Sequence, residues 1–206
     1  RFNTDKDSKR KEFRKKWNLK ENEIAIGIIG RLVPIKNHKF FIDAIQEVLK
    51  KSEFPIRAFI VGDGEEKQNI INYIKNKNLD LSLDYTPATF HLTSWIKEID
   101  RVNSGMDIIC LTSLNEGTPV SLIEAQASGK PIVSTKTGGI ENIVLENKTA
   151  LLSKKNDLDN FSKNLLSLVN DSNKRKLFSK FGLEKSKDFH YDQLVSNIKN
   201  LYEDTL

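Results

Sequence analysis

The sequence predicts an α/β fold in which a doubly wound parallel sheet carries helices on both faces and is followed by a C-terminal helical segment. Three observations predict this class. Short apolar runs recur between residues 23 and 153, segments with helical spacing of apolar residues separate them, and strand-like runs stop near Asp157. Continuous apolar runs are typical of strands buried on both faces, and right-handed crossovers place a helix against each parallel strand pair.

The expected elements follow one another in a regular order. A basic helical lead-in occupies 1–22, an α/β core 23–156 and the C-terminal helices 157–206, and the lack of a Gly-, Pro- or Ser-rich linker favours a single domain. The strand-like runs are 23–30, 55–62, 88–93, 107–112, 131–135 and 149–153. The helical patterns are 38–51, 65–77, 94–104, 119–128, 157–171, 172–189 and 191–206.

Composition narrows the class of protein. The chain has 206 residues, of which 38% are hydrophobic, and this is enough for a substantial core. The chain has one cysteine, Cys110, and this excludes an internal disulfide. Because this cysteine lies in an apolar run, it is expected to be a buried hydrophobic residue rather than a nucleophile. No apolar run is long enough to span a bilayer, and the N-terminal residues lack the apolar core of a signal peptide. We therefore expect a cytoplasmic protein.

Positive charge is concentrated at the N-terminus. Residues 1–20 carry nine Lys or Arg and three Asp or Glu, whereas the net charge of the whole chain is +5. Such a basic helix is most often a solvated face, and the alternatives are docking on nucleic acid or on an anionic membrane surface.

The residues that follow the strands are the first candidates for a ligand site, because parallel sheets bind ligands beyond the carboxyl ends of their strands. After the first strand, Gly30 permits close approach of a ligand to the backbone and Arg31 offers a planar fork for phosphate oxygens. Lys36 adds a second cation before a helix that Asn37 is expected to cap. The pattern predicts a diphosphate clamp, and a surface loop with two ordinary cations is the alternative.

Glycine turns follow two further strands. Gly62 and Gly64 permit a tight turn after the second strand, although Gly-Asp-Gly alone is a weak signal, and Gly138 and Gly139 bring backbone amides to the same edge of the sheet. Neither G-x-G-x-x-G nor G-x-x-x-x-G-K-[ST] is present. A phosphate site here would therefore depend on side-chain cations.

Two glutamates flank the helix that follows the run 107–112. Thr118 is the expected N-cap and Pro119 the first helical residue, so that Glu116 falls in an exposed loop and Glu124 in the second helical turn. Helical geometry places this second glutamate near an apolar stripe, formed by Val120, Ile123 and Ala127.

A half-buried carboxylate at Glu124 needs hydrogen-bond donors, because an unpaired buried charge costs several kcal/mol. The hydroxyl groups of a ribose or a sugar are suitable donors. The structural alternative is an ion pair with Lys130.

With these residues in view, the sequence resembles the C-terminal, nucleotide-sugar-binding domain of glycosyltransferases with the GT-B fold, in particular the retaining enzymes of family 4. The motifs are IGIIGRLVPIKNHKFFIDA, FIVGDGEE, DIICLTSLNEGTPVSLIEAQASGKPIVSTKTGGIENIV and TALLS, spanning 23–171. The most specific features are the pair Glu116 and Glu124, with seven residues between, and the upstream GRL-x-x-x-K. The resemblance implies a Rossmann-like sheet, one half of a GT-B fold.

The resemblance also implies a role for each matching residue. Arg31 and Lys36 would bind the donor diphosphate and stabilise the leaving nucleotide, and Glu116 would reach the donor sugar. Glu124 would accept hydrogen bonds from the ribose. The segment 91–94 would contact the base largely through its backbone, although the family often has glycine where Thr93 stands. The other implied binding residues are Gly30, Gly62, Gly64, Ser94, Gly117, Thr118 and Pro119.

The same resemblance implies substrates and partners. The donor would be a UDP- or GDP-sugar, with no separate cofactor and no metal, because side-chain cations neutralise the diphosphate. An acceptor-binding domain would precede this chain in a longer enzyme. That enzyme would serve cell-surface polysaccharide biosynthesis, on a lipid-linked or saccharide acceptor. Docking of the basic N-terminal segment on an anionic surface would place it at the inner face of the membrane.

Two other functions compete with this interpretation. A GT-B-type nucleotide-sugar epimerase could use the same diphosphate-binding residues, but it would be expected to carry more acid–base residues. The chain has three histidines, His38, His91 and His190, and these fit capping, core-edge or surface positions better than catalytic ones. A non-enzymatic basic module could bind nucleotides or nucleic acid by stacking bases on Trp95 or Tyr85, yet Trp95 fits a core position better. We expect no nucleic-acid partner.

Overall fold

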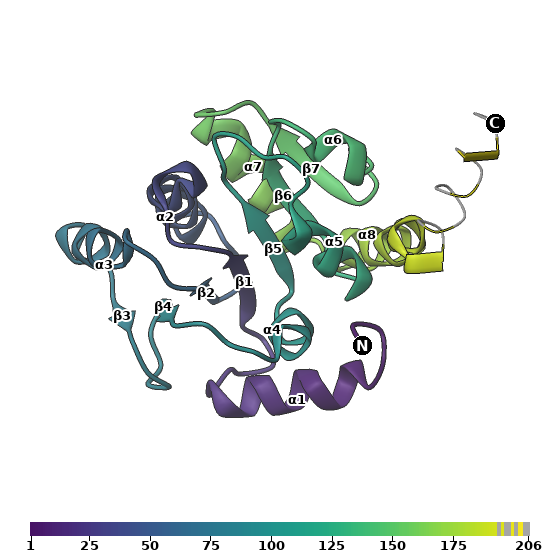
Figure 1. The fold of residues 1–206 in the computed structure, drawn as a ribbon. Coiled ribbons are helices and arrows are strands. Elements are labelled where there is room, and N and C mark those ends of the chain that lie inside the picture. The colour runs from purple at the N-terminus through teal and green to yellow at the C-terminus, as the bar shows by residue number, and fades with distance from the viewer. Residues whose placement is uncertain (193–194, 196–198, 200–201, 204–206) are drawn as a thin grey trace.

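The computed structural model describes residues 1–192, 195, 199, 202 and 203. The chain forms a seven-stranded sheet in the order β3-β4-β2-β1-β5-β6-β7, and every strand pair is parallel. Helices cover both faces of this sheet (Figure 1), which confirms the predicted doubly wound α/β class. The expected helix 191–206 lies for the most part outside the described residues.

Each of the six predicted apolar runs contains a strand. The centre of the sheet is β1, which pairs with β2 on one side and β5 on the other. A seventh, edge strand of two residues lies in the segment 79–87, which was not predicted as a strand because two residues show no periodicity. The strands are β1 (Ile24–Ile29), β2 (Ile56–Val61), β3 (Leu81–Ser82), β4 (Phe90–Thr93), β5 (Ile108–Leu111), β6 (Ile132–Thr135) and β7 (Ala150–Ser153).

The helices follow the predicted order, with two departures. The helix before β5 begins at Ile99, because residues 94–98 have no regular structure, and a four-residue helix after β6 was not predicted. The helices are α1 (Lys6–Lys16), α2 (His38–Leu49), α3 (Lys67–Asn76), α4 (Ile99–Gly105), α5 (Val120–Ala127), α6 (Ile140–Ile143), α7 (Leu158–Asn170) and α8 (Ser172–Lys185). Short 3-10 helices occupy Pro34–Lys36 and Ser186–Phe189.

Two apolar layers sandwich the sheet. On one face, alternate residues of β1 such as Ile26 pack with α2, α3 and α7. On the other face, residues such as Ile29 pack with α1, α4, α5 and α6. Burial on both faces explains why the strands read as continuous apolar runs. Cys110 lies inside the first layer, and burial raises the pKa of its thiol, in keeping with the predicted hydrophobic role.

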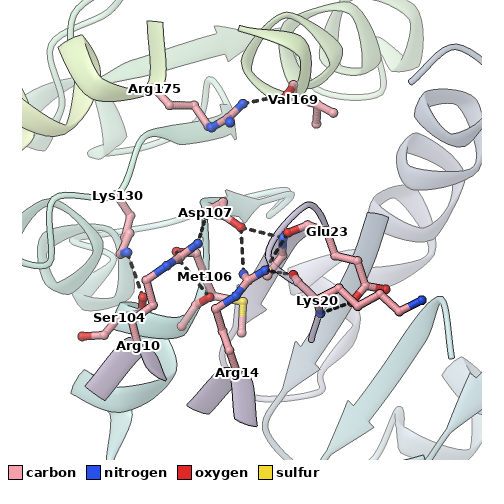
Figure 2. A network of polar contacts seen from close by, with 12 residues as sticks. Arg10, Arg14, Lys20, Glu23, Ser104, Met106, Asp107, Lys130, Val169 and Arg175 are labelled. Atoms are coloured by element: carbon pink, nitrogen blue, oxygen red, sulfur yellow. Dashed lines mark hydrogen bonds and ion pairs between the residues drawn. The ribbon is translucent and has the colours of Figure 1, made fainter. Parts of the chain in front are cut away.

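The basic lead-in is a packed helix rather than a free arm. Helix α1 lies against α4 and buries Phe13, while Arg10 and Arg14 both bind the carboxylate of Asp107, just before β5, at 2.7 and 3.3 Å (Figure 2). The same carboxylate accepts a hydrogen bond from the Ala25 backbone amide of β1 at 2.8 Å. Part of the N-terminal charge thus holds α1 to the amino edge of the sheet. The solvated cations of α1 include Lys11, Lys15 and Lys16.

Within the described part of the chain, no helix combines the length and the apolar character needed to cross a bilayer.

Candidate functional site

An open cavity of about 600 Å³ lies beyond the carboxyl ends of β1 and β5, between the loops that follow these strands and the start of α5. It brings together residues that are far apart in the sequence and that the sequence predicts as site residues. The predicted residues that line it are Gly30, Arg31, Lys36, Glu116, Thr118, Pro119 and Glu124. The predicted residues outside its lining are Gly62, Gly64, Thr93, Ser94 and Gly117.

Lys36 and Glu116 form an ion pair in this cavity. The Lys36 Nζ lies 2.5 Å from the Glu116 Oε1, and the side chains are only 20% and 10% exposed. The Ser113 hydroxyl donates to the same carboxylate oxygen at 2.5 Å, and the Thr112 hydroxyl donates to the Lys36 carbonyl at 2.8 Å. Glu116 lies in an exposed loop as expected, but its own carboxylate is mostly covered, because Lys36 and Ser113 both donate to it. Sequence reasoning missed Ser113, whose only signal was its place two residues after the end of β5.

Arg31 is exposed at the mouth of the same cavity. Its loop is fixed by its neighbour Leu32, whose backbone amide donates to the Asp63 carbonyl at 3.0 Å and whose carbonyl accepts from the Glu66 amide at 2.9 Å. A rigid backbone with a solvent-facing guanidinium is suited to binding an anion, because few internal contacts must be broken first.

Glu124 lies half-buried in α5 and lines the cavity together with residues of the loop after β1. Burial raises the pKa of its carboxyl group, while the charge of Arg1 acts in the opposite direction. The alternative ion pair with Lys130 is wrong, because that ammonium group donates instead to the Ser104 carbonyl at 3.0 Å (Figure 2). A half-buried carboxylate that faces a cavity is satisfied best by hydroxyl donors from a ligand.

The start of α5 differs from the prediction by one residue. The helix begins at Val120, and Pro119 takes the N-cap position with an extended backbone (φ −71°, ψ 101°) and no side-chain capping bond. The expected Thr118 cap is wrong, because its side chain lies one residue too early to reach the first free amides. The predicted apolar stripe is wrong as well, since Val120 is 61% exposed on the cavity side. The buried residues of the helix are Leu122, Ala125 and Gln126.

The expected cap of α2 also differs. Asn37 has a left-handed backbone (φ 52°) and makes no side-chain bond to the helix, whereas its carbonyl accepts from the Phe40 amide at 3.1 Å. N-cap side chains usually require an extended backbone, so this conformation prevents the predicted cap. The next residue, His38, is buried, and burial together with the charge of Lys36 lowers its pKa to about 4.

The glycine turns let the loops at the carboxyl edge of the sheet, here called the rim, pack on one another. A Cβ at Gly62 would lie 1.9 Å from the Gly30 carbonyl oxygen, and one at Gly138 would lie 1.7 Å from the Glu116 carbonyl oxygen. The Gly139 amide donates to the same Glu116 carbonyl at 3.1 Å. The structure thus gives these glycines a packing role that the sequence did not suggest.

The segment 91–94 splits into an inner and an outer part. His91 is fully buried and stacks on Phe59 with ring centroids 4.7 Å apart, and burial, helped by the charge of Arg57, lowers its pKa to about 4. Thr93 is buried at the end of β4, whereas Ser94 is exposed. A contact with a ligand is therefore open only to the end of this segment.

Trp95 does not occupy the expected core position. It is 55% exposed and lines the cavity, because the irregular stretch 94–98 gives it no helical face that packs on the core. Tyr85, the other candidate for base stacking, packs against Trp17 with ring centroids 4.6 Å apart and lies outside the cavity lining.

No group of three or more His, Cys, Asp or Glu side chains suited to a metal ion occurs among the residues that the structure describes.

Comparison with known proteins identifies the family. The model of the family described as "Glycosyl transferases group 1" matches residues 9–185. The chain belongs to this family. A relative of this group 1 chain, the UDP-Gal:alpha-D-GlcNAc-diphosphoundecaprenol alpha-1,3-galactosyltransferase of Escherichia coli, is 32% identical over 189 residues, which cover 90% of this chain and 47% of the relative. The poly(ribitol-phosphate) alpha-N-acetylglucosaminyltransferase of Staphylococcus aureus is 26% identical over 73% of this chain and 29% of the relative. The group 1 chain thus spans about half the length, or less, of the curated relatives it matches.

Solved structures of other proteins have the same fold as this group 1 chain. TarM of Staphylococcus aureus, in complex with UDP and saccharide ligands, matches with a TM-score of 0.77 at 24% identity, over 88% of this chain and 36% of that one. HepE of Anabaena, in complex with UDP and glucose, matches with 0.79 at 18% identity, over 96% and 52%. The C-terminal domain of a group 1 family protein of Francisella tularensis matches with 0.71 at 23% identity, over 84% and 90%. The implied GT-B relationship is confirmed at the level of fold, and the epimerase and nucleic-acid alternatives gain no support.

Proposed function

We propose that this chain is the donor-binding half of a retaining, family 4 glycosyltransferase, which transfers a sugar from a nucleoside-diphosphate-sugar to an acceptor. The observation that carries the proposal is the single cavity shared by Arg31, the Lys36–Glu116 pair and the half-buried Glu124. In this proposal Arg31 and Lys36 bind the diphosphate, Glu116 binds the sugar, and the half-buried carboxylate of Glu124 binds the ribose of such a donor.

The chemistry of transfer fits this arrangement. Departure of the nucleotide places negative charge on the diphosphate, and preplaced cations lower the barrier by stabilising that charge. Arg31 and Lys36 are these cations, and the amino end of α5, beside Pro119, adds the positive end of a helix dipole at the same cavity. In this proposal Glu116, which is held by Lys36 and Ser113, accepts hydrogen bonds from the sugar.

The finer assignments belong to the same proposal. The donor is a UDP- or GDP-sugar bound without a metal. The UDP in the TarM and HepE structures favours a UDP-sugar over a GDP-sugar. The acceptor is a lipid-linked or other saccharide of cell-surface polysaccharide biosynthesis, in line with the diphosphoundecaprenol named in the Escherichia coli relative. An acceptor-binding domain outside this chain presents it. The full enzyme works at the cytoplasmic face of the membrane, where the exposed cations of α1, such as Lys11 and Lys15, favour anionic lipid.

Thermal unfolding in the presence of nucleotides tests the proposal. The chain is heated with UDP, GDP, ADP and their sugars, as wild type and as Arg31→Ala and Glu124→Gln. A ligand at about 100 times its dissociation constant stabilises by roughly 2.7 kcal/mol, which raises Tm by about 5 to 11 °C for a chain of this size. We expect a shift that is selective for one base and is lost in both variants.

The matched control is Lys136→Ala. Lys136 follows β6 at the same edge of the sheet, but it pairs with Glu141 at 2.8 Å and does not line the cavity. This variant should keep the wild-type shift. The absence of a shift with every nucleotide, or a shift that Arg31→Ala leaves intact, would contradict the proposal.

A further inference from the structure

The donor assigned above leaves one wall of the cavity without a ligand group. Trp95 is 55% exposed there, although tryptophan is among the side chains that gain most from being covered. It stands in the irregular stretch 94–98, between β4 and α4, where few backbone hydrogen bonds fix its position. Something else must therefore hold this stretch in place.

Asp63 provides that hold from the neighbouring loop. Its Oδ2 accepts a hydrogen bond from the Ser94 hydroxyl at 2.6 Å and lies 3.1 Å from the Lys67 Nζ, and its Oδ1 accepts from the Gly64 amide at 2.9 Å. Hydrogen bonds from Ser94 and then Lys67 lower the pKa of Asp63 to about 2, so the carboxylate is a charged acceptor at neutral pH. Charge-assisted hydrogen bonds of this kind are stronger than neutral ones.

Asp63 also touches the other side of the donor site. Its backbone carbonyl accepts from the amide of Leu32, the residue directly after Arg31. One residue thus connects the loop that carries the diphosphate-binding cation with the stretch that carries Trp95.

We propose that Trp95 stacks on the base of the donor nucleotide and that Asp63 is the positioning residue that holds it there through Ser94. The inference rests on the proposed function, in which Arg31 binds the diphosphate and Glu124 binds the ribose. The aromatic ring of Trp95, which lines the same cavity, is then left to contact the base. Stacking on an aromatic face tolerates any base. Trp95 therefore supplies affinity for the nucleoside, and base selectivity comes from other groups.

Calorimetric titration of the chain with UDP, GDP and inorganic pyrophosphate separates the two parts of the site. Trp95→Ala should weaken the tighter-binding nucleotide about tenfold, because base–aromatic stacking contributes about 1 to 3 kcal/mol, and should leave pyrophosphate within twofold of wild type. Asp63→Ala and Ser94→Ala should each weaken the nucleotide about three- to tenfold, again without affecting pyrophosphate. The double variant should bind no more weakly than Asp63→Ala, because that change already breaks the bond to Ser94.

Two further measurements sharpen the test. Tyr85→Ala removes an aromatic side chain that is 45% exposed but lies outside the cavity, and it should leave both ligands unaffected. The chain has two tryptophans and Trp17 is buried, so quenching of fluorescence by the nucleotide should disappear in Trp95→Phe, which retains a ring for binding.

The outcomes separate this inference from the function on which it rests. If Trp95→Ala and Asp63→Ala bind nucleotide as tightly as wild type while Arg31→Ala does not, the inference is overturned and the donor site stands. Equal loss of nucleotide and pyrophosphate in Trp95→Ala, with an unchanged Tm, also overturns it. Failure of the wild-type chain to bind either nucleotide overturns the proposed function, and this inference with it.

Discussion

At the scale of single residues, the site is organised by contacts between side chains that are distant in the sequence. The sequence predicted Lys36 and Glu116 as site residues because each follows a strand, and both line the cavity. It could not predict that they pair with each other, since they lie 80 positions apart and meet only because β1 and β5 are neighbours. Ser113 was missed for the same reason, and Trp95 because its apparent helical spacing falls in an irregular stretch.

Gly138 gives a residue-scale prediction. Its backbone is left-handed (φ +54°) and a Cβ would lie 1.7 Å from the Glu116 carbonyl oxygen, so Gly138→Ala must push the Glu116 loop away. We expect a loss of more than about 1 kcal/mol in the free energy of unfolding, measured in urea, together with weaker nucleotide binding.

Gly117→Ala is the matched control, because a Cβ at Gly117 meets nothing within 4 Å. Gly117 lies on the loop that carries Glu116, and its replacement by alanine should change the free energy of unfolding by less than about 0.5 kcal/mol. Equal stability of the two variants would show that the packing of these loops does not constrain the rim.

At the scale of elements, the sequence predicted what is long and periodic and missed what is short. Six strands were expected and found, whereas β3 and α6, with two and four residues, are too short to show a period. Element ends were less predictable, because they depend on single backbone conformations such as those of Asn37 and Pro119. The role of α1 was left open by its charge, and its attachment depends on Asp107 at the start of a distant strand.

The attachment of α1 can be tested at Asp107. This side chain is 14% exposed and accepts from Arg10, Arg14 and the Ala25 amide, so Asp107→Asn leaves two partly buried cations without their counter-charge. Breaking a buried ion pair typically costs about 3 to 5 kcal/mol. We expect a loss of about 3 kcal/mol in urea unfolding and faster hydrogen exchange in α1.

Arg101→Ala serves as the comparison. It removes an ion pair between α4 and α1 whose partners, Arg101 and Glu12, are about half exposed (53% and 52%), and exposed pairs contribute less than about 1 kcal/mol. If Asp107→Asn is as mild as this variant, α1 is held by its apolar contacts alone.

At the scale of the whole molecule, the sheet gathers the predicted loops at one edge. The carboxyl ends of β1 and β5 open on the cavity, while the amino edge is occupied by α1 and its ion pairs (Figures 1 and 2). The class of fold followed from the sequence, but the strand order did not, because apolar periodicity carries no information on which strands pair. The acceptor side cannot be predicted from this chain, whose length is about half that of its curated relatives.

The proposed division of labour predicts binding without turnover. Given a UDP- or GDP-sugar and a saccharide or lipid-linked acceptor, this chain should bind the nucleotide and transfer no sugar above background, because the acceptor would not be held near the donor. Mass spectrometry of the acceptor measures this. Efficient transfer by the chain alone would show that the donor half is sufficient.

The two ends of the open sheet have a consequence for solubility. The edge strands are β3, with two residues, and β7, with four. Lys148 precedes β7, and Lys154 and Lys155 follow it. Edges that are short or bordered by lysine are poor templates for a strand from another molecule. By this argument the two open edges of the sheet resist the addition of strands from further copies, which is the first step of amyloid-like growth.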